Sequence, residues 1–283
     1  GQVGAVTATQ ITGLTTTAKF AVVTKSPLTG FIADSLSSSY FALELKRLGL
    51  DALVITGQAA STVYIHINDQ NVEIREAEQL RGKSPGETEA LIRSELNSPA
   101  VRVAAIGKAG ENRVRFATIS NEGRHAGRGG VGAVMGSKNL KAIAVCGGRE
   151  TRVADPTGVE AIADSLRQRS LGSLTDKYRK IGTVANLAVF NRLGTLPTRN
   201  FQQSTFDHAE ALSGESLTEH NFSRRHGCAS CTIQCERLFK TLDGAEQRLE
   251  YETLFALGPL CGIKDPEVVL QAAQLCDLYG LDT

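Results

Sequence analysis

Three cysteines in the second half of the chain are close enough in sequence to share one metal site. Cys228, Cys231 and Cys235 follow the pattern Cys-x2-Cys-x3-Cys, which we expect on one short loop and helical turn. A [4Fe–4S] cluster is held by cysteine thiolates, commonly three from such a local run and one from a distant segment. The spacing therefore favours a [4Fe–4S] cluster, and we expect its fourth cysteine to lie beyond residue 283.

Zinc binding and redox chemistry are the alternatives for these cysteines. Structural zinc could use the three thiolates and His226, but His226 stands only two residues before Cys228, a poor spacing for a closed tetrahedron. A redox dithiol would need a single Cys-x2-Cys pair. The remaining cysteines have apolar neighbours and are expected to be small buried apolar residues: Cys146, Cys261 and Cys276.

A second candidate site is the glycine-rich segment 123–138. The pattern G-x-G-x-x-G is matched by Gly127, Gly129 and Gly132. The N–H groups of such a loop can bind a phosphate, and cations stand nearby at Arg124, Arg128 and Lys138. In a dinucleotide-binding fold the motif follows its strand directly, whereas here seven residues separate Ile119 from Gly127. An anion-binding loop and a glycine turn required by packing are therefore equally compatible with these residues.

The elements that must position these sites are mainly strands in the first half of the chain. Short β-branched runs bounded by turn residues predict strands at 21–25, 52–56, 63–67, 102–106, 113–119 and 141–145. Apolar residues at helical spacing predict a helix over 37–48 that ends at Gly49. A capping box of Ser84 and Glu87, with Pro85 between them, predicts a second helix. This second helix is expected to bury Ala90, Leu91 and Leu96.

Helices dominate the sequence after Gly148. Asp155-Pro156 and Asp265-Pro266 each predict a helix N-cap followed by a first-turn proline, and 216–219 predicts a further capping box. The helix after Asp265 is expected to end at Gly280. We therefore expect an α+β fold, with a β-rich domain over residues 1–150 and a mostly α-helical domain over 151–283 that carries the cysteines.

Composition excludes several classes of protein. The 283 residues include 31 basic and 30 acidic side chains, so the formal charge of +1 excludes a strongly basic binder of nucleic acid or of a membrane surface. No apolar run approaches the roughly 18 residues of a membrane span, and no signal peptide opens the chain. We expect a cytoplasmic protein with neither nucleic-acid nor membrane partners.

Taken together, the glycine segment 127–143 and the cysteine motif resemble the aldehyde:ferredoxin oxidoreductase family. Further matching stretches follow in the same order, at 23–30, 44–46, 106–112, 196–200, 251–253 and 277–282. The resemblance runs along the whole chain but covers about half of the family's usual length. It implies a β-rich base domain that binds two pterins, with helical domains above it.

The resemblance implies a tungsten or molybdenum bis-pterin cofactor, a [4Fe–4S] cluster and a magnesium ion bridging the pterin phosphates. Residues aligned with the family's pterin contacts are Arg124, His125, Gly127, Arg128, Asp277, Leu281 and Asp282. An earlier pterin segment maps to Lys19 and to Ser38 within 36–39. Here the chain departs from the family, which has arginine at the first position and an Asn-Ser-Gly-Gly-like run at the second.

By the same resemblance, Glu252 is the candidate catalytic acid–base. Its neighbours Tyr251, Leu254 and Phe255 are expected to desolvate it and raise its pKa. A solvated carboxylate at a helix start is the alternative, and Glu250 is the second choice for the role. Some family members bridge two subunits with an iron ion, but the aligned Gln271 is a poor ligand, so that iron is not expected.

The resemblance implies oxidation of a small-molecule aldehyde to a carboxylic acid, with electrons passing to ferredoxin or another electron-transfer protein, and allows a homodimer. A family variant that reduces an aromatic acyl-CoA is one alternative. A nicotinamide-dependent Rossmann enzyme with structural zinc is a second, and a non-catalytic paralogue is a third. The chain by itself is expected to be inactive, because half of the cavity wall would be missing.

Overall fold

The structure is a computed structural model that describes residues 4–9, 18–150 and 154–283, with the backbone alone for 4–9. The chain divides into two compact units. The first unit comprises residues 1–162, 228–230 and 277–282, and the second comprises 163–227, 231–276 and 283. In the described part of the chain, every helix is too short or too polar to cross a membrane.

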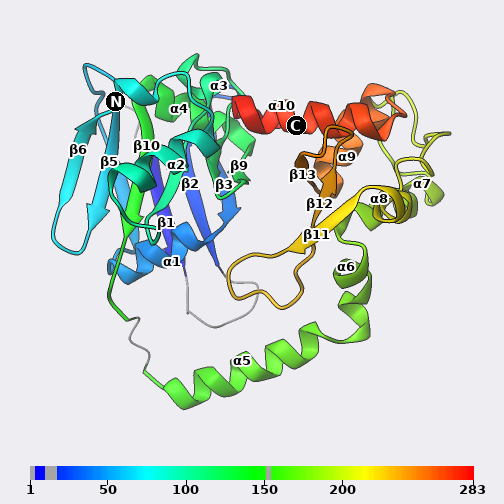
Figure 1. Cartoon of the computed structure of the whole chain (residues 1–283), viewed down its shortest axis with the longest axis horizontal. Helices are drawn as coiled ribbons and strands as arrows, with labels where there is room; N and C mark the ends of the chain where they lie inside the picture. The colour runs from blue at the N-terminus through cyan, green and yellow to red at the C-terminus, as the bar shows by residue number, and fades with distance from the viewer. Residues whose placement is uncertain (1–3, 10–17, 151–153) are drawn as a thin grey trace. The chain divides into compact units, whose positions relative to one another are not determined.

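Among the described residues up to 150, the first unit forms two sheets and four helices, whose arrangement Figure 1 shows. Its strands are β1 (Gly4–Thr9), β2 (Lys19–Lys25), β3 (Ile32–Ser38), β4 (Ala52–Ile55), β5 (Val63–Asn68), β6 (Val72–Glu76), β7 (Arg102–Ala105), β8 (Ile119–Asn121), β9 (Arg124–Ala126) and β10 (Leu140–Cys146). Its helices are α1 (Tyr40–Arg47), α2 (Pro85–Glu95), α3 (Lys108–Glu111) and α4 (Val131–Ser137), with 3-10 turns η1 (Glu78–Leu80) and η2 (Arg128–Gly130).

Both sheets are largely antiparallel. The smaller sheet has the order β3-β2-β1-β4, and the larger has the order β6-β5-β10-β7-β8-β9, in which only the pairing of β10 with β5 is parallel among the described strands. β9, which precedes the glycine motif, pairs with β8, and β10, which follows it, lies between β5 and β7. The strands on either side of the motif are thus not neighbours, whereas in a Rossmann fold they would be parallel neighbours in one sheet. The fold expected for the Rossmann alternative is therefore wrong.

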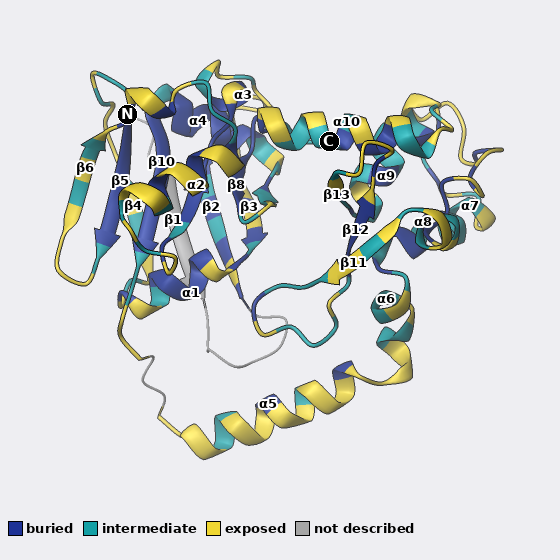
Figure 2. Cartoon of the chain, in the orientation of Figure 1, coloured by how far each residue is buried: buried dark blue, intermediate teal, exposed yellow. Residues whose placement is uncertain are grey.

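The central strands of the larger sheet, β5, β10 and β7, are buried on both faces, and β5 and β10 are dark in Figure 2. Side chains along β10 alternate between its faces. Ile143 and Val145 join a core with Phe20 of β2 and Phe41 of α1, whereas Ala144 packs on the opposite face with Ile92 of α2. The two cores hold the strand ends that carry the candidate site residues at fixed positions.

The second unit packs helices around a three-stranded antiparallel sheet with the order β11-β12-β13. Its strands are β11 (Phe222–His226), β12 (Glu236–Lys240) and β13 (Glu246–Leu249). Its helices are α6 (Asp176–Lys180), α7 (Asn186–Arg192), α8 (Gly214–His220) and α9 (Tyr251–Leu257), with 3-10 turns η3 (Ser173–Thr175), η4 (Thr183–Ala185) and η5 (Pro259–Cys261). Two helices span the boundary residues of the units, α5 (Pro156–Ser170) and α10 (Pro266–Tyr279).

The α+β class is confirmed, and so are most of the predicted elements. Asp155 and Asp265 cap α5 and α10 by accepting hydrogen bonds from Gly158 N and Glu267 N, both at 2.9 Å. Ser84 and Glu87 form the predicted capping box at the start of α2.

Several predictions are wrong in detail. The strand predicted at 113–119 is mostly turns, and the helix predicted from residue 37 begins after Ser39 because 37 and 38 end β3. Ser216 lies inside α8, whose cap is Ser213. On α2, Ala90 and Leu91 are exposed, and the buried residues are Pro85, Thr88, Glu89 and Ile92.

Gly136 of α4 packs closely against the backbone of Gly110 in α3. A Cβ atom at this position would lie 1.9 Å from the carbonyl oxygen of Gly110, so the two helices could not approach as they do. We expect Gly136→Ala to lower the free energy of unfolding by about 1–3 kcal/mol, the usual cost of overpacking. The matched control is Gly86→Ala on α2, where no atom lies within 4 Å of the added Cβ. Urea unfolding measures both, and equal midpoints would contradict the prediction.

Candidate functional site

The glycine-rich segment 123–138 begins in the turn of the β8–β9 hairpin, includes β9, and continues through η2 into α4. Gly129 and Gly130 have positive φ angles of 81° and 69°. Added Cβ atoms would lie 2.1 Å from Arg115 O at Gly130 and 2.3 Å from Thr118 O at Gly132. Packing against 115–118 therefore requires glycine at positions 130 and 132. At Gly127 the group in the way is instead a side chain, because a Cβ there would lie 2.5 Å from Asp282 Oδ1.

The segment 277–282 is fixed against the same part of the first unit. Leu281 forms an antiparallel bridge with Ala117. Thr118 N donates to Gly280 O at 2.9 Å, and Asp282 N donates to Phe116 O at 3.0 Å. These backbone bonds place the end of the described chain next to the glycine-rich segment.

Charged side chains then join the two segments. His125 Nε2 lies 3.0 Å from Asp277 Oδ1, and its Nδ1 lies 2.8 Å from Ser120 Oγ. Arg128 Nε lies 3.6 Å from Asp282 Oδ2. The structure thus brings together the residues predicted from 124–128 and from 277–282, which are Arg124, His125, Gly127, Arg128, Asp277, Leu281 and Asp282.

Lys19 and Ser38 also meet, because they are direct partners in the register of β2 with β3. β3 contacts β9, and Asn121 Nδ2 donates to Ser37 Oγ at 2.9 Å, so this pair adjoins the hairpin that carries Arg124. Asn121 is fully buried, and its Oδ1 has no hydrogen-bond partner among the described residues. Sequence reasoning missed Asn121, although it stands three residues before Arg124.

A partly buried charge network holds the turn of the same hairpin. Glu122 has a positive φ of 50°, its carboxylate accepts from Tyr40 N at 2.9 Å, and it pairs with Arg102 at 3.1 Å. Glu89 accepts from Glu122 N at 2.7 Å, and burial raises the pKa of Glu89 to about 7. Glu122 therefore ties the hairpin to the start of α1, two residues after Ser38. This network could not be predicted, because its members lie far apart in the chain.

The three motif cysteines lie on the connection between β11 and β12. This connection has no helical turn, contrary to the prediction; Ser230 and Gln234 have positive φ angles of 57° and 48°. The three thiols are partly exposed and free of disulfides. Ala229, between the first two cysteines, packs in the first unit with Ala18 and Leu43, next to the strand ends of Lys19 and Ser38.

Metal-binding geometry is not preformed around this loop. Among the described residues, no three His, Cys, Asp or Glu side chains are placed to hold one metal ion. His226 Nδ1 lies 2.6 Å from Glu236 Oε2, and the fully buried Glu236 also pairs with Arg248. Outside the motif, Cys146 and Cys276 are partly buried, but Cys261 is exposed, so its expected burial is wrong.

Glu252 lies in the first turn of α9 and is exposed. Leu254 is buried, and the ring of Tyr251 packs on Phe255 at 5.0 Å, so these neighbours do not cover the carboxylate. The expected desolvation of Glu252 is therefore wrong for this chain. Burial raises the pKa of Tyr251, and the adjacent charge of Glu252 raises it further.

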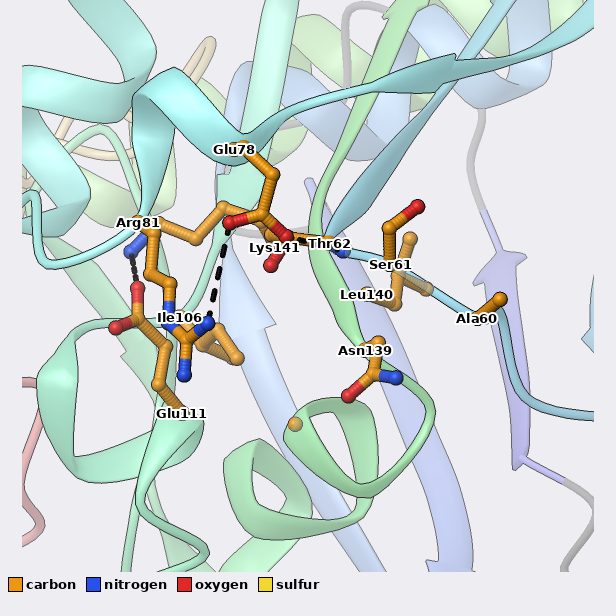
Figure 3. A pocket seen from close by; sticks show the side chains of 11 residues that line it. Ala60, Ser61, Thr62, Glu78, Arg81, Ile106, Glu111, Asn139, Leu140 and Lys141 are labelled. Atoms are coloured by element: carbon orange, nitrogen blue, oxygen red, sulfur yellow. Dashed lines mark hydrogen bonds and ion pairs between the residues drawn. The ribbon is translucent and has the colours of Figure 1, made fainter.

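A polar cavity of about 120 Å³ lies elsewhere in the first unit (Figure 3). Its wall includes Lys141, whose side chain is fully buried and whose Nζ donates to Glu111 Oε1 at 2.5 Å and to Lys83 O at 2.7 Å. Burial lowers the pKa of this lysine. Arg81 faces Glu78 across the opening at 3.9 Å. Positive and negative groups are balanced here, and the predicted site residues lie outside this wall.

Two family models match nearly all of the chain. The aldehyde ferredoxin oxidoreductase N-terminal domain matches residues 2–147, and domains 2 and 3 of the same family match residues 160–283. The chain belongs to the aldehyde ferredoxin oxidoreductase family. The assignment made from the glycine and cysteine motifs is thereby confirmed.

Curated members of the aldehyde ferredoxin oxidoreductase family resemble the chain closely. Proteins named tungsten-containing aldehyde ferredoxin oxidoreductase are 45% identical in Thermococcus kodakarensis and 44% identical in Pyrococcus furiosus. A P. furiosus protein named aliphatic sulfonate oxidoreductase, WOR-like subunit, is 32% identical. Each match covers 96% of this chain but 46% of the relative, so the chain spans about half the length of these proteins.

A solved structure of the family has the same fold. The active-site complex BamBC of benzoyl coenzyme A reductase, solved with 1,5-dienoyl-CoA, superposes with a TM-score of 0.83 at 29% identity. The match covers 99% of this chain and 45% of that chain. The fold described here is therefore that of the corresponding half of a family member.

Proposed function

We propose that the protein containing this chain oxidises aldehydes to carboxylic acids, RCHO + H2O → RCOOH + 2 H⁺ + 2 e⁻, and passes the electrons to ferredoxin. The observation that carries this proposal is the 43–45% identity, over 96% of the chain, to four proteins named as tungsten-containing aldehyde ferredoxin oxidoreductases. When bound, a pterin-held tungsten or molybdenum supplies the two-electron oxidation, and a [4Fe–4S] cluster carries the electrons away singly. The magnesium ion, a homodimer and a cytoplasmic location are further parts of the proposal.

The residues around 124–128 fit a phosphate-bearing pterin. Arg124 and Arg128 supply cations for phosphate, while Asp277 and Asp282 supply carboxylates suited to the amino-pyrimidinone edge of a pterin ring. The buried Asn121 Oδ1, without a partner among the described residues, is an acceptor for a further N–H group. The absence of a side chain at Gly127 lets the carboxylate of Asp282 approach the backbone there.

The thiol groups of the cysteine loop are suitable ligands for a [4Fe–4S] cluster. The three thiols on this loop form no disulfide, and they supply three of the four ligands that a [4Fe–4S] cluster needs. The left-handed backbone at Ser230 and Gln234 lets the loop turn sharply between the thiols. We propose Glu252 as the group that accepts a proton from water during the oxidation and returns it afterwards. Its exposure in this chain leaves the carboxylate accessible to such a partner.

Metal analysis of the full-length protein, purified without oxygen, tests the proposal. We expect one tungsten or molybdenum and about four iron atoms per chain, together with aldehyde-dependent reduction of a viologen dye. Iron far below this value without tungsten or molybdenum would overturn the cofactor assignment. A loaded cofactor without turnover on any aldehyde would instead favour the non-catalytic paralogue.

Reduction of an aromatic acyl-CoA is a second candidate function. It is favoured by the fold match to the benzoyl coenzyme A reductase complex, although the 29% identity of that match is lower than the 45% of the aldehyde-oxidising relative. Both reactions would use the same residues of this chain. Reoxidation of the reduced protein by benzoyl-CoA, with no turnover of aldehydes, would select this candidate.

A further inference from the structure

Arg237 is a buried arginine next to the cysteine loop, and the proposed chemistry does not yet use it. It is 1% exposed and lies on β12, which is buried along its first four residues (Figure 2). Its Nη1 donates to Gln234 O at 2.9 Å and to Glu236 O at 3.0 Å, the carbonyls on either side of Cys235. Its Nη2 donates to Arg179 O at 2.5 Å and to Tyr178 O at 3.4 Å. The guanidinium therefore clamps the backbone at Cys235 to the end of α6.

No carboxylate neutralises this guanidinium among the described residues. All four of its acceptors are carbonyl oxygens, its Nε has no partner there, and the nearby Glu236 pairs with His226 and Arg248. Its direct cross-strand neighbour is a second cation, Arg225. An unpaired buried charge is costly, and like charges opposite each other on two strands are destabilising. The arrangement is therefore suited to a negative group that binds beside β12.

The cysteine loop is the place where such a negative group would form. Arg237 Nη1 donates to the carbonyls on either side of Cys235, so its guanidinium lies beside the backbone of a proposed cluster ligand. A [4Fe–4S]²⁺ core with four thiolates carries a net charge of −2, and one electron makes it −3. A fixed cation beside this group stabilises the reduced state more than the oxidised state.

We propose that Arg237 is a positioning residue that raises the reduction potential of the cluster by its buried charge and by clamping the backbone at Cys235. The inference rests on the proposed [4Fe–4S] cluster. The exposed Arg225 contributes less, because solvent screens its charge. The role requires a cation at position 237, so lysine should serve better than an uncharged residue.

A potentiometric titration followed by electron paramagnetic resonance of the reduced cluster tests the proposal in the full-length, cofactor-loaded protein. We expect Arg237→Gln to make the cluster about tenfold harder to reduce, a potential lower by about 59 mV for one electron. Arg237→Lys should stay nearer to the wild-type potential, because it keeps the charge. The control Arg224→Gln removes an exposed arginine of β11 that pairs with Glu246 and should shift the potential less.

A second variant keeps the test decisive if Arg237→Gln does not fold. Arg225→Glu changes an exposed side chain and places a carboxylate opposite Arg237, so it should lower the potential while Arg237 stays in place. Unchanged potentials in Arg237→Gln and Arg225→Glu would overturn the inference, as would equal shifts in the Gln and Lys variants of Arg237. A wild-type protein without an iron–sulfur spectrum would instead overturn the proposed function.

Discussion

Cys231→Ser is expected to remove most of the iron from the full-length protein. A [4Fe–4S] cluster needs four thiolates, and the middle cysteine of the motif is one of three that a single loop supplies. A serine hydroxyl is not deprotonated at neutral pH and is a poor ligand for iron, so the cluster should be lost or should assemble incompletely. Iron content per chain and the visible absorption of the cluster measure the effect after purification without oxygen.

The matched control for this change is Cys261→Ser. Cys261 lies on η5, is exposed, and donates from Sγ to Ala256 O at 3.2 Å, outside the motif. We expect the control to keep the wild-type iron content. If Cys231→Ser keeps its iron too, the loop is not the cluster site. Zinc near one atom per chain in the wild type, lost in Cys231→Ser, would support the zinc alternative instead.

The candidate cofactor residues could be named from the sequence because they lie in dense, distinctive motifs. Their meeting could not be predicted, since it depends on the bridge between Leu281 and Ala117 and on the backbone bonds beside it. Residues whose role depends only on such contacts could not be identified from the sequence for the same reason. Asn121 and Glu122 are examples, because their partners Ser37 and Tyr40 stand more than 80 positions away.

The strands were predictable where β-branched residues form short runs, as in β5 and β10. β3 was missed because residues 32–38 include Asp34, Ser35 and Ser37, which have low strand propensity; pairing with β2 along its whole length imposes the strand. At 113–119, by contrast, a strand was predicted where the structure has mostly turns. There Arg113 has a positive φ of 57°, and Val114 and Ala117 pack with the small residues of α3 and α4 instead of extending.

The second half was predicted to be mostly helical, and its sheet was missed. The strand 222–226 carries Arg224, Arg225 and His226, so it shows no apolar alternation. Its stability comes from pairing with β12, whose Leu238 and Phe239 are buried. This sheet matters for function, because β11 and β12 hold the two ends of the cysteine loop.

Glu252→Gln is expected to lower kcat for aldehyde oxidation by about 10²–10⁴-fold, the usual contribution of a positioned acid–base group. Glutamine keeps the shape of the side chain but cannot accept the proton. Iron and tungsten contents should be unchanged, because Glu252 lies on α9, away from the cysteine motif in sequence. Steady-state kinetics with a viologen acceptor, on protein of equal metal content, measure the effect.

The matched control is Glu250→Gln, two residues earlier, at the cap of α9. If Glu252 carries the proton, the control keeps most of the activity; if the losses are reversed, the role belongs to Glu250.

The pKa of Tyr251 provides a check on the structure of α9 that does not depend on enzyme activity. The charge of Glu252 raises the pKa of Tyr251, so Glu252→Gln should lower that pKa toward its ordinary value. An alkaline absorbance titration of tyrosine that shows this small downward shift would indicate an intact α9, and the loss of turnover could then be assigned to the missing carboxylate.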